Sequence, residues 1–162
     1  MELATFGAGC FWGVERWFKE MFPSIRTRVG YTGGTVSNPT YEQVCGQQTG
    51  HVEALQITFD PAVVSYRDLV VFFYELHDPT TVDAQGPDHG RQYASASFYH
   101  NAEQERIAQE VTAKVSKDFK QPIVTRIQPA TTFWTAEEYH QNYLDKHPTG
   151  YCSHLPRTLK KR

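Results

Sequence analysis

The order in which strand patterns and helix patterns follow one another constrains the fold of this chain more than any other feature. Alternating apolar and polar residues indicate strands, and apolar residues three or four positions apart indicate helices. Up to residue 99, strand patterns cover residues 2–6, 25–31, 51–60 and 93–99, and helix patterns cover residues 10–22 and 65–77. This order, β-α-β-β-α-β, is that of the split βαβ arrangement.

Further patterns extend this core toward the C-terminus. A helix is predicted over residues 101–118, because Ile107, Val111 and Val115 lie four positions apart, and a strand is predicted over residues 123–128. We therefore predict an α+β fold. It is a two-layer α/β sandwich with a ferredoxin-like split βαβ core, a mixed sheet and long coil segments.

Three pairs of residues have the spacing of a capping box and mark the starts of predicted helices. They are Ser65 with Asp68, Asn101 with Gln104, and Thr135 with Glu138. The third pair predicts a last helix that runs over residues 135–147.

Two long segments, residues 32–50 and 78–92, are rich in turn-forming residues and predict loops. The first loop is expected to contain one helical turn near residues 41–44. Loops of this length in a compact domain usually carry function. We expect both loops, with the tail over residues 148–162, to lie over one end of the sheet and to form the functional site.

The composition excludes several classes of protein. The 162 residues fit one domain, residues 1–162, and the net charge of −2 gives no reason to expect a nucleic-acid partner. The longest apolar run, residues 69–74, is too short to cross a membrane. A strand pattern follows directly on Met1, so no signal peptide is expected, and three cysteines are too few for a secreted disulfide framework. We expect a monomeric cytoplasmic protein.

One cysteine, Cys10, lies among three glycines and two large aromatic residues in the segment Gly-Ala-Gly-Cys-Phe-Trp-Gly, residues 7–13. Glycines between a strand and a helix are typical of a dinucleotide-binding turn. Here, however, the third glycine comes one position late, and Phe11 and Trp12 would block a pyrophosphate. The next strand also ends without the acidic residue that holds a ribose. A nucleotide site is therefore not expected.

The start of a helix changes the reactivity expected of a thiol, although unpaired cysteines are often buried packing residues. The free N–H groups and the helix dipole favour an anion, so they predict a lowered pKa for Cys10. Phe11 and Trp12 cannot easily both enter the core from one turn, which leaves one of them to line a surface pocket. We predict that Cys10 is a nucleophile beside an apolar pocket.

A carboxyl group lies on the apolar face of a predicted strand. Strand alternation places Glu53 on the same face as Leu55, Ile57 and Phe59. Glutamate is almost never fully buried without a partner. Two alternatives stay open from the residues alone: a paired or neutral acid with a raised pKa, or a strand-end side chain that reaches solvent.

With Cys10, its aromatic neighbours and Glu53 in place, the sequence resembles the methionine sulfoxide reductase A family over most of its length. The resemblance rests on six segments in order: residues 9–13 (Gly-Cys-Phe-Trp-Gly), 30–34 (Gly-Tyr-Thr-Gly-Gly), 39–45 (Pro-Thr-Tyr-Glu-Gln-Val-Cys), 50–54 (Gly-His-Val-Glu-Ala), 88–93 (Asp-His-Gly-Arg-Gln-Tyr) and 150–152 (Gly-Tyr-Cys). The family implies reduction of the S epimer of methionine sulfoxide, free or in proteins, and thus protein repair.

The resemblance implies a role for each polar residue that matches these segments. Cys10 would attack the sulfoxide sulfur, and Glu53 would protonate the sulfoxide oxygen as a neutral acid. Tyr41 and Tyr93 would donate hydrogen bonds to the same oxygen. Asp88 would help to position the polar side of the site.

The resemblance also implies an apolar wall, formed by Phe11 and Trp12, that receives the methyl group of the substrate. It implies that Cys152 resolves the oxidised Cys10 to a disulfide, which thioredoxin, or dithiothreitol, then reduces. Some relatives carry another cysteine beyond the resolving one. This chain has none, so no relay is expected. Cys45 is interpreted as a buried packing residue, and neither a prosthetic cofactor nor a metal is expected.

Two other classes of function are alternatives. A cysteine hydrolase would use Cys10 with a histidine as base, and the sequence offers His51, His89 and His140. Consumption of thiol, rather than release of an acyl product, would separate the reductase from the hydrolase. A metal-binding or recognition module has little support, because the cysteines include no Cys-x-x-Cys pair.

Overall fold

The strands and helices of the predicted core all form in the structure, a computed structural model that describes residues 1–157. The strands are β1 (Glu2–Ala8), β2 (Arg26–Thr32), β3 (Val52–Phe59), β4 (Ala84–Gln85), β5 (Asp88–His89), β6 (Ser95–Tyr99), β7 (Arg126–Pro129) and β8 (Trp134–Thr135). The α-helices are α1 (Phe11–Met21), α2 (Tyr41–Cys45), α3 (Tyr66–Leu76), α4 (Ala102–Val115) and α5 (Tyr143–Lys146). Short 3₁₀ turns cover Arg91–Tyr93, Ser116–Asp118 and Glu138–His140.

Six strands form the main sheet in the order β7-β6-β1-β3-β2-β8. In the split βαβ core, β3 lies between β1 and β2 and is antiparallel to both, and β6 pairs with the other edge of β1. The pairing of β6 with β7 is parallel, so the sheet is mixed. This confirms the predicted fold class. The strands β4 and β5 form a separate hairpin.

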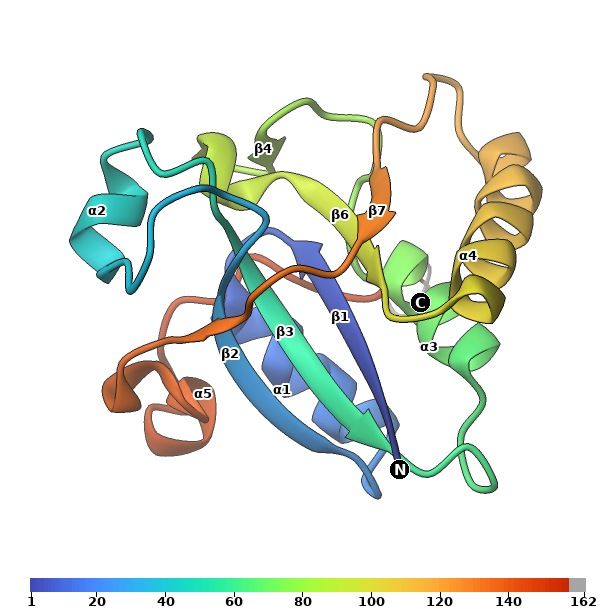
Figure 1. Ribbon diagram of the computed structural model, residues 1–162, viewed down its shortest axis with the longest axis horizontal. Helices are drawn as coiled ribbons and strands as arrows, with labels where there is room; N and C mark the ends of the chain where they lie inside the picture. The colour runs from blue at the N-terminus through green and yellow to red at the C-terminus, as the bar shows by residue number, and fades with distance from the viewer. Residues whose placement is uncertain (158–162) are drawn as a thin grey trace.

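The helices cover one face of the main sheet, and the core lies between them and the strands (Figure 1). Leu55, Ile57 and Phe59 of β3 are buried on this face, as strand alternation predicts. Aromatic rings fill the layer between: the ring centroids of Phe6 in β1 and Phe73 in α3 are 4.9 Å apart. The core therefore fixes α1 and α3 relative to the sheet.

The opposite face of the sheet carries a smaller apolar cluster. Val52 and Ala54 point to it from β3, and Phe98 points to it from β6. Ala130 and Phe133, from the segment between β7 and β8, pack over this cluster. The chain after β7 therefore serves as the cover that a second layer of helices provides in other α/β folds.

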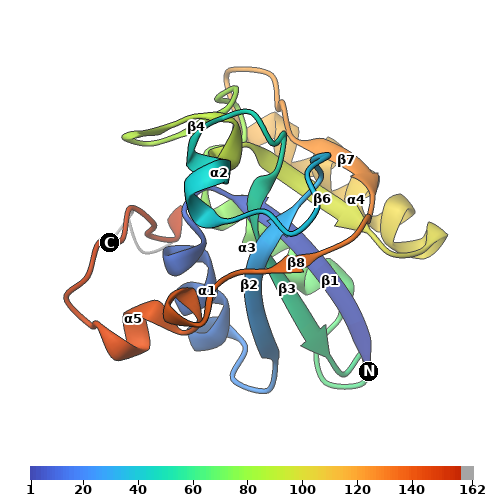
Figure 2. The same cartoon turned by 60° about the vertical axis from the view of Figure 1, so that its left-hand side comes forward.

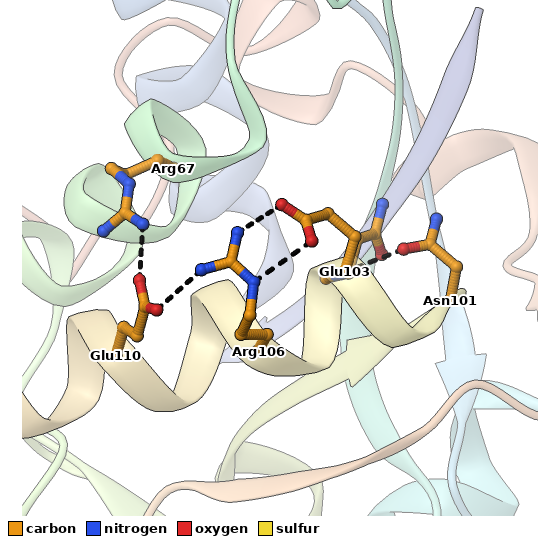
Figure 3. Close-up of polar contacts among 6 residues, drawn as sticks. Arg67, Asn101, Glu103, Arg106 and Glu110 are labelled. Atoms are coloured by element: carbon orange, nitrogen blue, oxygen red, sulfur yellow. Dashed lines mark hydrogen bonds and ion pairs between the residues drawn. The ribbon is translucent and has the colours of Figure 1, made fainter.

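Helix α4 begins as the capping pattern predicts. The side chain of Asn101 accepts a hydrogen bond from the backbone N–H of Gln104 at 2.9 Å. On the exposed side of the helix, Arg106 pairs with Glu103 and Glu110, and Arg67 of α3 pairs with Glu110 (Figure 3). This network links α4 to α3, although exposed ion pairs each contribute little to stability.

The predicted last helix over residues 135–147 is wrong. Thr135 lies in β8, which pairs with β2, and does not cap a helix. The side-chain amide of Gln141 accepts a hydrogen bond from the backbone N–H of Val29 and donates one to its carbonyl, at 3.0 and 2.9 Å. Asn142 then takes a left-handed conformation (φ 53°), which a helix does not continue through. Contacts with β2 therefore override the local helix pattern, and only the short α5 remains.

Two smaller boundaries also differ from the prediction. Tyr93 belongs to a 3₁₀ turn and not to the following strand, and β7 starts at Arg126 instead of residue 123. Of the tail predicted over residues 148–162, residues 158–162 lie outside the described part of the chain.

Both long loops lie at one end of the sheet, where β1 passes into α1 (Figures 1 and 2). The loop of residues 33–51 carries α2, and the loop of residues 77–94 carries the β4–β5 hairpin. Within the tail, Cys152 and His154 lie beside Gly13 in the first turn of α1, and Arg157, the last described residue, donates hydrogen bonds to the carbonyl oxygens of Tyr74 and His77 at the end of α3. Within residues 1–157, no helix is long and apolar enough to cross a membrane.

Candidate active site

Cys10 lies at the junction of β1 and α1, where it is the N-cap residue of the helix. Its side chain is 7% exposed. The preceding Gly9 has a φ of +94°, which a residue with a side chain rarely adopts. A Cβ at Gly9 would also lie 2.9 Å from Cβ of Gln85. The glycine therefore allows the close turn that places the thiol at the helix start.

The prediction of a lowered thiol pKa is wrong. The backbone N–H groups of Trp12 and Gly13 do lower the pKa of Cys10, as predicted for a helix start. Burial, however, raises it more, and the charge of Glu53 raises it further, so the pKa of the thiol lies above its ordinary value. Desolvation of the thiolate outweighs the helix end because Cys10 is nearly enclosed.

Glu53 is buried on the helix face of β3, where it is only 1% exposed. Its Oε1 atom accepts a hydrogen bond from the backbone N–H of Phe11 at 3.3 Å, so the carboxyl group reaches the first residue of α1. Its Oε2 atom is buried and has no partner among residues 1–157. Of the two alternatives from the sequence, the buried acid is confirmed.

Burial raises the pKa of Glu53 to about 8; the hydrogen bond from Phe11 opposes this shift, and the charge of Asp88 adds to it. At neutral pH most of the carboxyl groups therefore carry a proton. A protonated carboxyl has an O–H group to donate, and this side chain can act as a general acid.

The raised pKa of Glu53 predicts a loss of stability with rising pH. Its folded-state pKa of about 8 lies above the ordinary 4.5, so between these pH values the folded protein binds more protons than the unfolded chain. The free energy of unfolding therefore falls as pH rises. Glutamine cannot ionise, so Glu53→Gln should be more stable than wild type at about pH 9, by on the order of a few kcal/mol relative to their difference at about pH 5.

Urea denaturation at these two pH values measures the effect. Glu20→Gln, at an exposed carboxylate of α1, is the matched control and should follow wild type at both. A Glu53→Gln protein whose stability changed with pH just as wild type does would rule out the raised pKa.

Two tyrosines from the long loops lie near Glu53. Tyr41 is the first residue of α2, and Tyr93 ends the 3₁₀ turn before β6. Both side chains are half-buried. Desolvation raises the pKa of each hydroxyl, and the charge of Glu53 raises both further. The charge of Cys10 also raises the pKa of Tyr93. Both phenols therefore stay protonated at neutral pH and can donate hydrogen bonds near Glu53 and Cys10.

Tyr41 is held in place by a residue that the sequence does not single out. The carboxylate of Glu137 accepts the backbone N–H of Tyr41 at 2.9 Å with one oxygen and the hydroxyl of Tyr31 at 2.8 Å with the other. Tyr31 is opposite Glu53 in the β2–β3 register. A loop residue thus links α2 to the strand next to Glu53.

Asp88 lies on β5, close enough to Cys10 that its charge raises the pKa of the thiol. Its carboxylate accepts hydrogen bonds from the hydroxyl of Tyr151 at 2.9 and 3.0 Å and from that of Ser153 at 3.5 Å. The tail that carries Cys152 therefore contacts the polar side of the site.

The two aromatic residues after Cys10 take different positions. Phe11 is 1% exposed and packs in the core against Tyr31, whereas Trp12 is half-buried. The indole of Trp12 stacks on Tyr143 with 3.8 Å between ring centroids and donates a hydrogen bond to Nδ1 of His140 at 3.0 Å. This agrees with the expectation that only one of the pair enters the core.

The other cysteines take unequal positions. All three are free thiols. Cys152 lies beside α1, because a Cβ on Gly13 would be 3.0 Å from its Sγ atom. Gly13 is three residues after Cys10, about one helical turn away. Cys45 is half-buried rather than fully buried, and its sulfur accepts a hydrogen bond from Gln92 at 3.4 Å.

Two of the three histidines offered as a hydrolase base have partners of their own. Nδ1 of His51 accepts the N–H of Gly34, and its Nε2 lies 2.7 Å from the carbonyl oxygen of Val36. His140 accepts the indole N–H of Trp12, and His89 is exposed. These positions favour structural roles. Among residues 1–157, no group of three His, Cys, Asp or Glu side chains could hold a metal ion.

The residues that the sequence does not single out for the site come from two segments. Glu137 and Tyr143 belong to the segment that the sequence predicts as a plain helix, where it offers only His140, as a hydrolase base, and Tyr151 and His154 come from the tail. No periodicity marks them. Only the Gly-Tyr-Cys segment at residues 150–152, part of the family resemblance, points to one of them, Tyr151.

Comparison with known proteins agrees with the geometry. The family model for peptide methionine sulfoxide reductase matches residues 2–162. The peptide methionine sulfoxide reductase MsrA of Methanothermobacter thermautotrophicus is 53% identical over 163 residues, which cover 99% of this chain and 96% of that protein.

Solved structures agree as well. Reduced Mxr1 from Saccharomyces cerevisiae is 37% identical and superposes with a TM-score of 0.92 over 96% of this chain and 92% of that chain. Mxr1 in complex with Trx2 shares the fold, at 24% identity and a TM-score of 0.66 over 96% of this chain and 89% of that chain. This chain therefore belongs to the peptide methionine sulfoxide reductase family.

Proposed function

We propose that this chain reduces methionine-(S)-sulfoxide, free and in proteins, to methionine, with Cys10 as the nucleophile and Glu53 as the acid. One observation carries the assignment. A buried thiol at the start of α1 lies near a buried carboxyl group whose pKa is raised to about 8, and the backbone N–H of Phe11 holds that carboxyl against the same turn. A nucleophile and a neutral acid side by side are what sulfoxide reduction requires.

In the first step, the sulfur of Cys10 attacks the sulfoxide sulfur while Glu53 gives its proton to the sulfoxide oxygen. The thiol proton returns to Glu53. The oxygen leaves the substrate and ends on Cys10 as a sulfenic acid, so that two electrons pass from Cys10 to the methionine sulfur. While Glu53 is neutral, its charge no longer opposes the thiolate, and the N–H groups of Trp12 and Gly13 stabilise the thiolate as it forms.

Tyr41, Tyr93 and Asp88 complete the polar side of the site. The phenols of Tyr41 and Tyr93 donate hydrogen bonds to the sulfoxide oxygen, where negative charge develops before the proton arrives. Their position near Glu53 supports this role. Asp88, whose charge contributes to the raised pKa of Glu53, helps to keep the acid protonated.

The half-buried Trp12 is the part of the apolar wall that meets the methyl group on sulfur, and Phe11 belongs to the same wall as a core residue that packs on His140, as Trp12 does. Stacking on Tyr143 and the hydrogen bond to His140 hold the half-buried ring of Trp12 in one orientation. The apolar wall binds the methyl group, and the polar donors on the other side bind the oxygen. The methyl group and the oxygen exchange places between the S and R epimers, so the site accepts only one epimer.

Cys152 resolves the sulfenic acid. Its thiol attacks the sulfur of Cys10, a disulfide forms and the oxygen leaves as water. A thioredoxin reduces this disulfide by thiol–disulfide exchange, and dithiothreitol can replace it. The position of Cys152 beside the first turn of α1 supports this role. The complex of the yeast relative Mxr1 with Trx2 is in keeping with such a partner.

The remaining proposals concern the protein as a whole. We propose that residues 1–162 act as one reductase domain, a monomer, since the family model matches residues 2–162. The electrons come from thiols, and no prosthetic cofactor takes part. We place the protein in the cytoplasm, because free thiols suit a reducing compartment.

The decisive test separates the two epimers. Purified protein is mixed with a peptide that contains either the S or the R epimer of methionine sulfoxide, together with dithiothreitol, and both peptides are weighed by mass spectrometry. Loss of one oxygen from the S epimer alone is expected. Reduction of both epimers, or of neither, would contradict the proposal.

Removing the resolving thiol should separate the two half-reactions. Cys152→Ser is expected to reduce about one sulfoxide per enzyme when thioredoxin is the reductant, and then to stop with sulfenic acid on Cys10. Dithiothreitol, which is small enough to reach Cys10, should restore turnover. Dimedone labelling and peptide mapping measure the trapped species. Full turnover of Cys152→Ser with thioredoxin, or a wild-type disulfide between Cys10 and Cys45, would show that Cys152 is not the resolving thiol.

A further inference from the structure

The C-terminal tail of the chain packs against the start of α1, where two glycines leave the surface without side chains. The imidazole of His154 lies over two glycines: a Cβ on Gly9 would be 3.3 Å from its Nε2 atom, and a Cβ on Gly13 would be 3.1 Å from its Cγ atom and closer still to Nδ1. The same Cβ on Gly13 would be 3.0 Å from Sγ of Cys152. Real Cβ atoms essentially never come within 3.0 Å of a neighbour, as this one would with Nδ1, so His154 can lie here only because Gly13 has no side chain.

His154 cannot move aside without losing the contacts that hold it. Its side chain is buried, and Nε2 lies 2.6 Å from the carbonyl oxygen of Ala8 at the end of β1. Its own carbonyl oxygen accepts a hydrogen bond from the indole N–H of Trp17 at 2.9 Å. Gly13 and Trp17 are four residues apart on α1, so the tail, which contacts both, lies along one face of the helix.

These contacts hold Cys152 between two anchors. On one side, the hydroxyl of Tyr151 donates hydrogen bonds to Asp88, and on the other side His154 is seated over Gly13. The thiol of Cys152 itself lies 3.5 Å from the carbonyl oxygen of His154. The tail is therefore docked along residues 151–154.

We propose that Gly13 is a positioning residue for the resolving step. Because Gly13 has no side chain, His154 and Cys152 can pack against it. This holds the thiol of Cys152 beside Gly13, which is about one helical turn from Cys10. The inference rests on the role of Cys152 proposed above. Gly13 contributes to the first step only its backbone N–H, which alanine keeps; its missing side chain sets how often Cys152 meets the sulfenic acid.

Displacement of Cys152 would affect one step of the catalytic cycle, the formation of the disulfide. Attack of Cys152 on the sulfenic acid of Cys10 is an intramolecular reaction, and such reactions lose about 10²-fold in rate when a group is misplaced by about 1 Å. A methyl group at Gly13 would force His154 off the helix, because its Cβ would lie within 3.0 Å of Nδ1, and would itself move Cys152 by a few tenths of an ångström. Because Cys152 is only two residues from His154, displacement of His154 would move Cys152 further. Disulfide formation should therefore slow down, whereas the attack of Cys10 on sulfoxide should not.

Gly13→Ala tests this directly. Alanine is the better helix former, so the change does not weaken α1 itself. The variant is expected to reduce sulfoxide in a single turnover within about threefold of the wild-type rate, but to form the disulfide at least about 10-fold more slowly. Turnover with thioredoxin should fall accordingly, and turnover with dithiothreitol should stay near that of wild type. Quenched-flow sampling with thiol counting gives both rates.

A matched control and two further variants make the outcome decisive. Gly46→Ala adds the same methyl group at a glycine in ordinary helical conformation (φ −70°), and it should behave as wild type. His154→Ala removes the anchor without touching α1, and it should slow disulfide formation as Gly13→Ala does. Cys152→Ser is the reference: if it still turned over fully with thioredoxin, the proposed role of Cys152 would fail, and not the inference about Gly13 alone.

Two results would overturn the inference while leaving the proposed function intact. One is a Gly13→Ala enzyme that forms the disulfide at the wild-type rate. The other is a loss of the first step as large as that of the second, which would indicate general damage to the site. If Gly13→Ala does not fold, His154→Ala decides: a wild-type rate of disulfide formation in that variant overturns the inference.

Discussion

Cys10→Ser is expected to abolish sulfoxide reduction with both thioredoxin and dithiothreitol, a loss of about 10³-fold or more. A serine hydroxyl is not ionised at neutral pH and is a poor nucleophile toward sulfur. The side chain is nearly isosteric with cysteine, so the buried turn between β1 and α1 should keep its structure. Steady-state consumption of methionine sulfoxide, followed by mass spectrometry, measures the loss.

Cys45→Ser is the matched control for this prediction, because it removes a half-buried thiol that lies on α2. It should keep most of the activity. Circular dichroism establishes that both variants are folded. Appreciable turnover by Cys10→Ser, or complete loss in a folded Cys45→Ser protein, would show that the nucleophile is assigned to the wrong thiol.

Glu53→Gln is expected to slow the first chemical step by about 10²–10⁴-fold, the usual loss when a general acid is removed. The amide fills the same buried space and can donate a hydrogen bond to the sulfoxide oxygen, but it has no proton to give. Substrate binding should therefore change little while the rate of sulfoxide reduction falls. Single-turnover kinetics over a range of substrate concentrations separate the two quantities.

The pH dependence of the first step tests whether Glu53 supplies the proton. Because burial raises the pKa of Glu53 to about 8, the neutral form dominates below that pH and is lost above it. The wild-type rate of the first step gains from ionisation of Cys10 as pH rises, whereas it loses the acid. Glu53→Gln retains only the gain, so the ratio of the wild-type rate to the variant rate should fall as pH rises through about 8. A ratio that does not change with pH, or a variant as fast as wild type, would show that Glu53 is not the acid.

Most of the fold could be predicted from the sequence because it depends on periodicity. The helix predicted over residues 10–22 is observed as Phe11–Met21, and the strand predicted over residues 51–60 is observed as Val52–Phe59. Alternation also placed Glu53 on the core face, where burial then raises its pKa. The last helix could not be predicted, since Gln141 is bonded to β2 across more than 100 residues of chain.

The site residues also fall into two groups: those that a local sequence pattern marks and those that only the family resemblance marks. Cys10 stands out from the local pattern of glycines and aromatic residues between a strand and a helix, and Glu53 from its register in β3. Tyr41, Tyr93, Asp88 and Cys152 come only through the family resemblance, because nothing in their own segments distinguishes a site residue from a loop residue. In the structure, Tyr41, Tyr93 and Asp88 lie near Cys10 and Glu53, and the tail that carries Cys152 contacts Asp88.

Local patterns in the sequence predict the order of the core strands and helices, the buried face of β3 and the turn at Cys10, because these depend on neighbours a few residues apart. The charge of each group and the thiols that can meet depend on the folded chain. The helix start that favours a Cys10 thiolate is a local feature, but the burial and the Glu53 charge that oppose it come from β3. The position of Cys152 likewise depends on Gly13 and His154, which come from opposite ends of the chain and meet only in the folded protein. Desolvation and contact act through space, and only the folded chain sets the distances on which they depend.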